Sequence, residues 1–301
     1  MNIQSDSPTV TPERVLLRLD WQVVRRLDGL LQGDYRTLFY GFGVDFADLR
    51  EYQAEDDIRY IDWNVTARMD TPYVRQYVED REITAWFLLD LSPSVDFGAV
   101  HNQKRTVLIN FVAVVARLLT RHGNRVGALM YGRDIQHMVP ARGGRLQVLR
   151  LINDMLKQPR LPHAPFTDLN LFLRGALNTI KRRSLVFVIS DFISAPGWEA
   201  PLSLLNQRHD VLAIRLWDPR EVELPDIGIV VMQDAETGEQ LHVDTHDRKF
   251  RQRFFDAAQS RELALKQSFK HAGVDMLSLS TEEDMVRAIV RFAKQRQGRR
   301  K

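Results

Sequence analysis

Short apolar runs alternate with amphipathic segments along most of the chain. Several of the runs are apolar at consecutive positions, which is typical of strands that are covered on both faces. The predicted strands are Ile83–Leu89, Arg125–Tyr131, Leu185–Ile189, Val211–Leu216 and Val274–Leu277. Segments with helical spacing lie between or after them, at 104–121, 145–157, 168–181, 200–208, 247–270 and 282–294. This alternation predicts an α/β fold, an open and mostly parallel sheet with helices on both faces.

Two further pairs of apolar runs are too close together for helical crossovers. Ile135–Val139 follows its neighbour after only a few polar residues, so the two runs should form an antiparallel hairpin. A second hairpin is predicted from Ile229–Met232 and Gln240–Val243, which are joined through a turn that contains Gly238.

The first third of the chain has a different character. Apolar residues recur at helical spacing from Pro12 to Leu31, with Thr11 as the expected N-cap, and a block of mixed charges follows at 50–68. We therefore expect residues 1–80 to form an N-terminal helix and a charged, aromatic segment that packs on a main domain at 81–301. Ion pairs and buried aromatic faces would hold that segment, although Trp63 and its neighbours would also suit a partner-docking surface.

Composition removes some classes of protein. The chain has 301 residues and no cysteine, which excludes disulfides, thiolate zinc sites and a cysteine nucleophile. Neither a signal peptide nor an apolar run of about 18 residues is visible, so we expect a cytoplasmic protein. A net charge of +3 gives only weak support to nucleic-acid binding by the basic end, Arg296 and Arg299–Lys301.

Oxygen-bearing side chains stand where three apolar runs stop or a helical segment begins. They are Asp90, Ser92, Ser94, Thr167 and Asp191. Loops that follow the carboxyl ends of parallel strands converge on one edge of an open sheet, so these side chains should meet there. Carboxylates and hydroxyls are the ligands of hard divalent cations, which predicts a site for Mg²⁺ or Mn²⁺. Alternatively, each side chain could only cap a local turn or helix.

The order Asp90-x-Ser92-x-Ser94, then Thr167, then Asp191, resembles the metal-ion-dependent adhesion site (MIDAS) of von Willebrand factor A domains. That resemblance implies that the three hydroxyls approach the cation and that the two carboxylates contribute directly or through water. The sixth position is then left for an acidic residue of a partner.

A second resemblance is to the family of unknown function DUF58, and it extends from about residue 30 to at least residue 217. Its signature residues are Arg50-Glu51-Tyr52-Gln53, Asp56-Asp57-Ile58-Arg59, Ile61-Asp62-Trp63-Asn64, Thr66-Ala67-Arg68, Arg142-Gly143-Gly144 and Ile189-Ser190-Asp191-Phe192. Val95 and Glu55 depart from the usual Met and Gly, and neither is a metal donor. The resemblance implies a von Willebrand factor A-like domain that works with MoxR-type AAA+ ATPases in assembling or activating other proteins.

We therefore expect a binding protein and not an enzyme. An aspartate-nucleophile phosphatase would need a second Asp at position 92, where this chain has Ser. Another Mg²⁺-dependent hydrolase remains the alternative enzyme, because a bound metal can activate water.

Overall fold

The computed structural model describes residues 11–27, 49–54, 56–69, 71–75, 82–99, 102–161, 167–235 and 237–298. They fall into two compact units. One unit holds the described residues up to 27 and from 83 onward, and the other holds those between 49 and 82.

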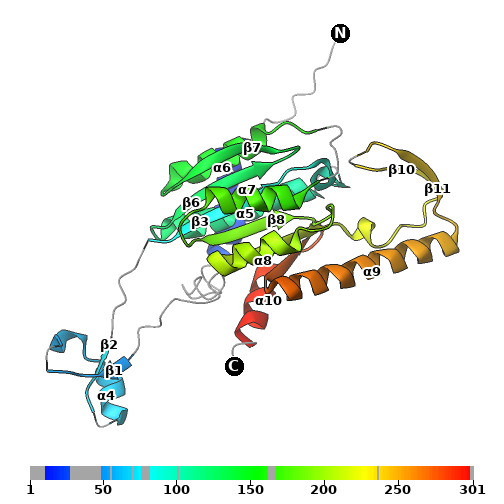
Figure 1. The fold of residues 1–301 in the computed structure, drawn as a ribbon. Coiled ribbons are helices and arrows are strands. Elements are labelled where there is room, and N and C mark those ends of the chain that lie inside the picture. Colours follow the sequence, from blue (N-terminus) through cyan, green and yellow to red (C-terminus); the bar gives the residue numbers. More distant parts are fainter. Residues whose placement is uncertain are drawn as a thin grey trace. The chain divides into compact units, whose positions relative to one another are not determined.

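A six-stranded sheet forms the centre of the larger unit, with the strand order β12-β9-β8-β3-β6-β7 (Figure 1). The strands are β3 (Thr84–Asp90), β6 (Arg125–Tyr131), β7 (Ile135–Arg142), β8 (Leu185–Ser190), β9 (Asp210–Trp217) and β12 (Asp275–Ser280). All neighbours are parallel except β6 and β7, which form the predicted antiparallel hairpin. The predicted fold class is therefore confirmed.

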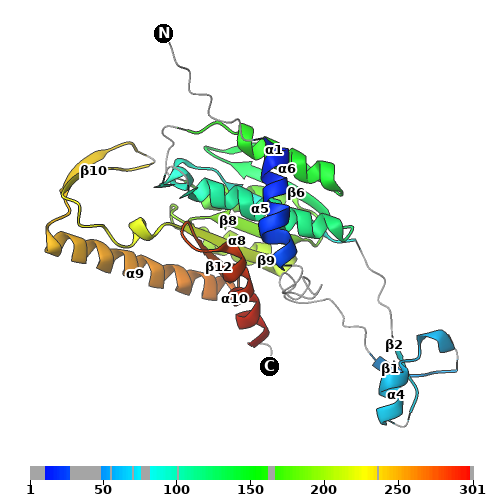
Figure 2. The ribbon, with the colours of Figure 1, turned by 180° about the vertical axis from the view of Figure 1, so that it is seen from behind.

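Helices cover both faces of this sheet. On one face α1 (Pro12–Leu19), α5 (Lys104–Arg121) and α6 (Arg145–Lys157) pack on one another, as the view from behind shows (Figure 2). On the other face lie α7 (Leu169–Thr179) and α8 (Glu199–Arg208), and α8 contacts α9 (Arg248–Ala272). The last helix, α10 (Met285–Gly298), packs against β12. Every helix predicted for this unit is present.

The sheet is buried because its side chains pack into both helical layers. All six residues of β8 are buried, and the ring of Phe187 stacks on Phe87 of β3 with ring centroids 5.1 Å apart. Phe111 of α5 meets Phe187 edge-on at 6.3 Å. Consecutive apolar residues along a strand are therefore explained by burial on both faces.

The N-terminal helix belongs to the larger unit. Thr11 is its N-cap, since the Thr11 Oγ1 accepts a hydrogen bond from the Arg14 amide, and its buried face includes Leu16 and Leu19. A π-helical turn, Asp20–Val24, continues it, and the helical conformation extends to residue 27. The rest of the predicted helix, 28–31, lies outside the described residues.

The second predicted hairpin is also confirmed. β10 (Ile229–Gln233) and β11 (Gln240–Asp244) pair antiparallel and lead into α9, whose N-cap is Asp247. A shorter hairpin, β4 (Gly98–Ala99) and β5 (Asn102–Gln103), leads into α5. None of the helices in the described part of the chain is long and apolar enough to cross a membrane.

The smaller unit is built on a two-stranded antiparallel sheet, β1 (Leu49–Glu51) and β2 (Tyr73–Arg75), with a 3₁₀ turn at Ile58–Tyr60 and helix α4 (Trp63–Met69). Carboxylates of the charged block cap local turns: Asp56 accepts a hydrogen bond from the Gln53 amide and Asp57 accepts one from the Arg59 amide. Within this small unit Trp63 is 67% exposed, so the unit itself does not bury the indole. Packing of the charged segment on the main domain stays a prediction.

Replacing Gly127 with Ala is expected to destabilise the protein by about 1–3 kcal/mol, because the added methyl group would overpack the space around this residue. Gly127 lies on β6 opposite a bulge in β7, and an added Cβ would lie 2.9 Å from the Val139 carbonyl oxygen and 3.0 Å from the Ala141 nitrogen. Both are backbone atoms and cannot move aside easily. Gly143→Ala is the matched control, since its Cβ would meet only the Asn124 carbonyl oxygen, at 3.7 Å. Chemical denaturation of both variants measures the difference, and equal stabilities would contradict the prediction.

Candidate functional site

The candidate site lies where the strand order of the sheet reverses. Chain order runs outward from β3 in one direction through β6 and β7, and in the other through β8, β9 and β12. In open α/β sheets the crevice beyond the carboxyl ends of the strands at such a reversal is the usual place for a ligand. Asp90 is the last residue of β3, and Asp191 directly follows β8.

Asp90 is a fully buried carboxylate that accepts hydrogen bonds from neutral groups of Ser190 and Ser92. Its Oδ2 accepts a hydrogen bond from the Ser190 hydroxyl at 2.6 Å, and its Oδ1 accepts one from the Ser92 amide at 3.0 Å. Burial, and then the negative charge of Asp191, raise the pKa of Asp90 to about 6. A positive charge beside Asp90 would offset the free-energy cost of ionising this buried carboxylate.

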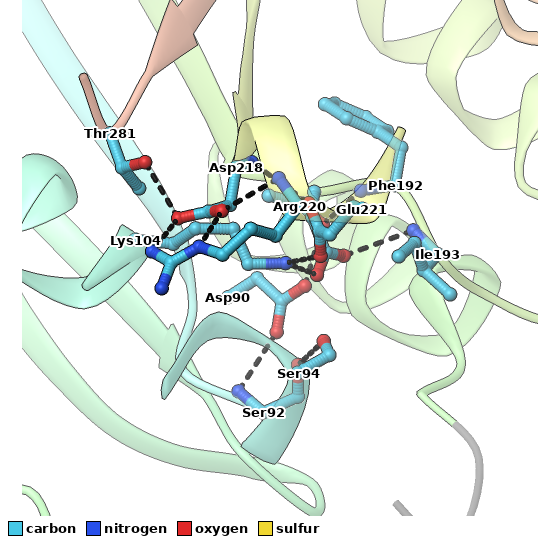
Figure 3. A network of polar contacts seen from close by, with 12 residues as sticks. Asp90, Ser92, Ser94, Lys104, Phe192, Ile193, Asp218, Arg220, Glu221 and Thr281 are labelled. Carbon is cyan, nitrogen blue, oxygen red and sulfur yellow. Dashed lines mark hydrogen bonds and ion pairs between the residues drawn. The ribbon is translucent and has the colours of Figure 1, made fainter. Parts of the chain in front are cut away.

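Ser92 and Ser94 lie beside Asp90 in the loop that leaves β3 (Figure 3). Their hydroxyl oxygens are 3.1 Å apart, close enough to share one ligand. A 3₁₀ turn, Pro93–Asp96, holds the two serines together, and Pro93 at its first position fixes the chain direction. Both serines are buried.

Asp191 is held by Lys104, the first residue of α5. The Nζ atom of Lys104 donates to the Asp191 Oδ2 at 2.7 Å and to the Glu221 Oε1 at 2.6 Å. Burial alone would lower the pKa of Lys104, but the charges of Asp191 and Glu221 outweigh it and raise the pKa above its ordinary value. Lys104 is therefore a buried ammonium between two carboxylates.

Thr167 lies against the loop that follows Asp191. Its backbone carbonyl accepts hydrogen bonds from the Ala195 amide at 3.1 Å and from the Ser194 hydroxyl at 2.8 Å. Thr167 is not the cap of α7, because the Asp168 carboxylate accepts the hydrogen bond from the Leu171 amide. The alternative of a helix cap is wrong for Thr167, and its role as a metal ligand stays a prediction.

The alternative of local caps holds in part for the two aspartates. One oxygen of each accepts a hydrogen bond from the amide two residues later: Ser92 for Asp90 and Ile193 for Asp191. The other oxygen makes contacts with residues far away in sequence, Ser190 and Lys104. Capping therefore uses one oxygen of each carboxylate and orients it, and the other oxygen is bonded to a residue from another segment.

The backbone turns sharply after Asp191. Phe192 has a φ of 59°, which is uncommon for a residue with a bulky side chain. Its ring packs edge-on against Phe269 at 4.8 Å and against Trp198 at 5.4 Å, and the Phe192 amide donates to the Ser190 hydroxyl. Aromatic packing thus stabilises the unfavourable φ of Phe192 in the turn that directly follows Asp191.

A second ion pair supports the site from the end of β9. The buried Asp218 accepts hydrogen bonds from the Arg220 Nε at 2.8 Å, the Arg220 Nη2 at 2.9 Å and the Thr281 hydroxyl at 2.7 Å. The Asp218 amide donates to Glu221, the same carboxylate that binds Lys104. The 3₁₀ turn Pro219–Glu221 therefore fixes Glu221 over the site (Figure 3).

A groove of about 1150 Å³ opens beside Ser94. The loop after β3, the loop after β8 and the β10–β11 hairpin line it, and Glu221 also borders it. Phe97, Ile193 and Leu241 contribute exposed apolar surface to this groove, with exposed fractions of 41%, 39% and 61%. Ser94 is the predicted metal ligand that borders the groove.

The side chains of the site offer few charged ligands and several neutral oxygens, and such a donor set fits a divalent cation. In the described part of the chain, no three His, Cys, Asp or Glu side chains form a group that could hold a metal. A cation would therefore depend on at most two carboxylates, those of Asp90 and Asp191, on hydroxyls and on water, which suits Mg²⁺ better than zinc.

Lys104 and Glu221 were not predicted from the sequence as site residues, and Ser190 was named only as part of the DUF58 signature. A lysine in the first turn of a mostly apolar helix is disfavoured by the helix dipole. The position of Lys104 was therefore a signal that its charge has partners outside the helix. Glu221 ends a capping-box pattern, Asp218 to Glu221, which predicts a turn but not a lysine partner. Of the basic end considered for nucleic-acid binding, Arg296 pairs with Asp275 at 2.9 Å, and Arg299–Lys301 lie outside the described residues.

Comparisons with known proteins give a family and several relatives. A model of the family described as "Protein of unknown function DUF58" matches residues 48–264. "Uncharacterized protein Rv1480" of Mycobacterium tuberculosis is 37% identical over 281 residues, which cover 93% of this chain and 88% of that protein.

Solved structures show more distant likeness. The conserved hypothetical protein BatB from Bacteroides thetaiotaomicron aligns with a TM-score of 0.47 and 11% identity, covering 72% of this chain and 99% of that one. The SpRpn10 VWA domain aligns with a TM-score of 0.38 and 12% identity, covering 69% of this chain and 94% of that one.

Proposed function

The chain belongs to the DUF58 family, and from this premise we propose that it is a protein-binding module and not an enzyme. In this proposal a divalent cation, Mg²⁺ or Mn²⁺, captures an acidic residue of a partner. Asp90, Ser92 and Ser94 would hold the cation, and Thr167 and Asp191 would complete the site directly or through water. When bound, the cation would supply an open coordination position for the partner's carboxylate.

The observation that carries the proposal is the electrostatic state of Asp90. Its carboxylate is buried, it is close to the like charge of Asp191, and its hydrogen-bond donors are the neutral groups of Ser190 and Ser92. A buried carboxylate without an opposite charge is costly, and its raised pKa expresses that cost. Two hydroxyls within reach of one ligand stand next to it.

Access to the site supports binding of a protein segment. The groove beside Ser94 combines apolar walls at Phe97 and Ile193 with the polar site at one end. A partner segment could lay apolar side chains along these walls while its acidic residue reaches the cation. The partner that we propose first, as the family resemblance implies, is a cytoplasmic MoxR-type AAA+ ATPase or a client of such an ATPase.

Replacing Ser94 with Ala is expected to weaken Mg²⁺ and Mn²⁺ binding by about tenfold or more, because one neutral ligand is lost while both carboxylates stay. Calorimetry with the full chain measures the affinity of each cation. Binding of a MoxR-type ATPase, measured with cation and with chelator, should fall in parallel with cation affinity.

Ser268→Ala is the matched control, since the Ser268 hydroxyl donates to Glu199 on the α8–α9 side of the molecule. It should leave both affinities unchanged. If Ser94→Ala bound cation and ATPase as the unmodified protein does, the metal-bridged mode of binding would be wrong. If cation binding fell and ATPase binding did not, the cation site would stand without this partner.

A further inference from the structure

Lys104 is the most unusual charged residue of the candidate site. It is 0% exposed, and its ammonium group contacts two carboxylates, Asp191 at 2.7 Å and Glu221 at 2.6 Å. Lysine is among the residues least often fully buried, and burial of its charge requires paired partners. This ammonium therefore has a defined place in the site.

The position of Lys104 in α5 does not explain its burial. Lys104 is the first residue of this helix, where the positive end of the helix dipole disfavours a cation. Its backbone amide donates to the Phe97 carbonyl, and the Phe97 ring lies 5.8 Å from the ammonium group. The two carboxylates and the neighbouring ring, rather than the helix, account for where the ammonium lies.

Among the described residues, the charges of Lys104 and of the three carboxylates of the site do not balance. Asp90, Asp191 and Glu221 bring three carboxylates to this part of the molecule, and Lys104 brings one ammonium. Asp218 does not enter this balance, because Arg220 is paired with it. With all groups ionised, two negative charges remain, which equals the charge of one divalent cation.

The two carboxylates that hold Lys104 differ in their surroundings. Asp191 is 1% exposed and lies close enough to Asp90 to raise its pKa. Glu221 is 19% exposed, it stands on a separate turn after β9, and it borders the groove. One partner of the ammonium is thus a predicted cation ligand, whereas the other is independent of the cation.

We propose that the ammonium of Lys104 is a built-in competitor of the divalent cation. In the cation-free protein the ammonium neutralises Asp191. When a cation binds, the Asp191 carboxylate pairs with the cation, and the ammonium stays paired with Glu221. Lys104 thereby sets the affinity of the site, and Glu221 is the group that makes its release from Asp191 possible. This inference rests on the proposed function.

The test compares two substitutions around the same ammonium. Lys104→Met keeps the length of the side chain without its charge, and it is expected to raise Mg²⁺ and Mn²⁺ affinity by roughly tenfold or more, since a positive charge a few ångströms from the cation is removed. Glu221→Gln leaves the ammonium with Asp191 alone and is expected to lower the affinity. Calorimetry with each metal salt and the full chain gives both values.

Stability in chelator gives a second readout. In chelator, Lys104→Met should unfold at a lower temperature than the unmodified protein, because the carboxylate of Asp191 loses its counter-charge. Addition of Mg²⁺ should raise the unfolding temperature of Lys104→Met by more than it raises that of the unmodified protein. Lys294→Met, on the exposed side of α10, is the matched control and should change neither measurement. If Lys104→Met does not fold, Glu221→Gln still tests the inference.

The outcomes separate this inference from the proposed function. Cation binding to the unmodified protein together with equal or weaker binding to Lys104→Met would overturn the competitor role and leave the cation site intact. Binding to Lys104→Met alone would support the role, since the ammonium would then fill the place of the cation. Unchanged or tighter binding to Glu221→Gln would overturn it, and absence of binding to every variant would overturn both proposals.

Discussion

Asp90→Asn is expected to abolish measurable Mg²⁺ binding and, in chelator, to make the folded protein more stable. Asn keeps the size of the side chain and one oxygen for the Ser92 amide or the Ser190 hydroxyl. It removes the negative charge that burial and Asp191 make unfavourable, as the pKa of about 6 indicates. We expect a gain in the free energy of unfolding of about 1–3 kcal/mol at pH 7.5, since each unit of pKa change corresponds to about 1.4 kcal/mol.

The two effects have opposite directions, which makes the test strict. A group that only stabilises the fold would lower the free energy of unfolding when it is replaced, whereas a cation ligand held against its own electrostatic preference should raise it. Chemical denaturation in chelator and calorimetry with Mg²⁺ measure the two effects. Asp256→Asn on the exposed face of α9 is the control and should change neither. Loss of stability in Asp90→Asn would mean that the Asp90 charge is favourably paired.

Asp218→Asn is expected to destabilise the protein by about 2–4 kcal/mol at pH 7, because it removes the charge of a buried carboxylate and leaves hydrogen-bond donors of Arg220 and Thr281 unsatisfied. The carboxylate accepts hydrogen bonds from the Arg220 side chain, the Arg220 amide and the Thr281 hydroxyl. Asn can accept with only one oxygen. The turn that carries Glu221 would then be less firmly held, so cation affinity should also change.

The pH dependence follows from the same contacts. Burial would raise the pKa of Asp218, but the hydrogen bonds and charge of Arg220, together with Thr281, outweigh it and hold the pKa below its ordinary value. Asp218 therefore stabilises the folded state above the ordinary pKa of about 3.9 and loses this contribution as the pH falls through the lowered pKa. Denaturation of both proteins from pH 7 to pH 3 should show the difference shrinking below about pH 4. A difference in the free energy of unfolding of less than about 0.5 kcal/mol at pH 7 would contradict the prediction, because substitutions of that size are typical of exposed residues.

One alternative reading of the sequence was wrong for a reason of local geometry, and one expectation stays open. Thr167 was a candidate cap of α7, but Asp168 stands one residue closer to the helix and its shorter reach to the Leu171 amide decides the cap. The ring of Trp63 is 67% exposed within its own small unit, and its burial against the main domain stays a prediction. Both depend on which groups surround a residue, and neighbouring letters in the sequence do not specify that.

The sequence by itself determined the alternation of strands and helices, both hairpins and the residues that end β3 and β8. These features follow from periodicity and from residues adjacent in the chain, such as Asp90, Ser92 and Ser94, so local rules are enough to find them. Only the tertiary structure decided which charges meet. Lys104 is 87 residues from Asp191 and 117 residues from Glu221, and no periodic pattern links positions so far apart. The sheet brings them together because β3, β8 and β9 end at the same edge, and there the ammonium of one segment meets the carboxylates of two others.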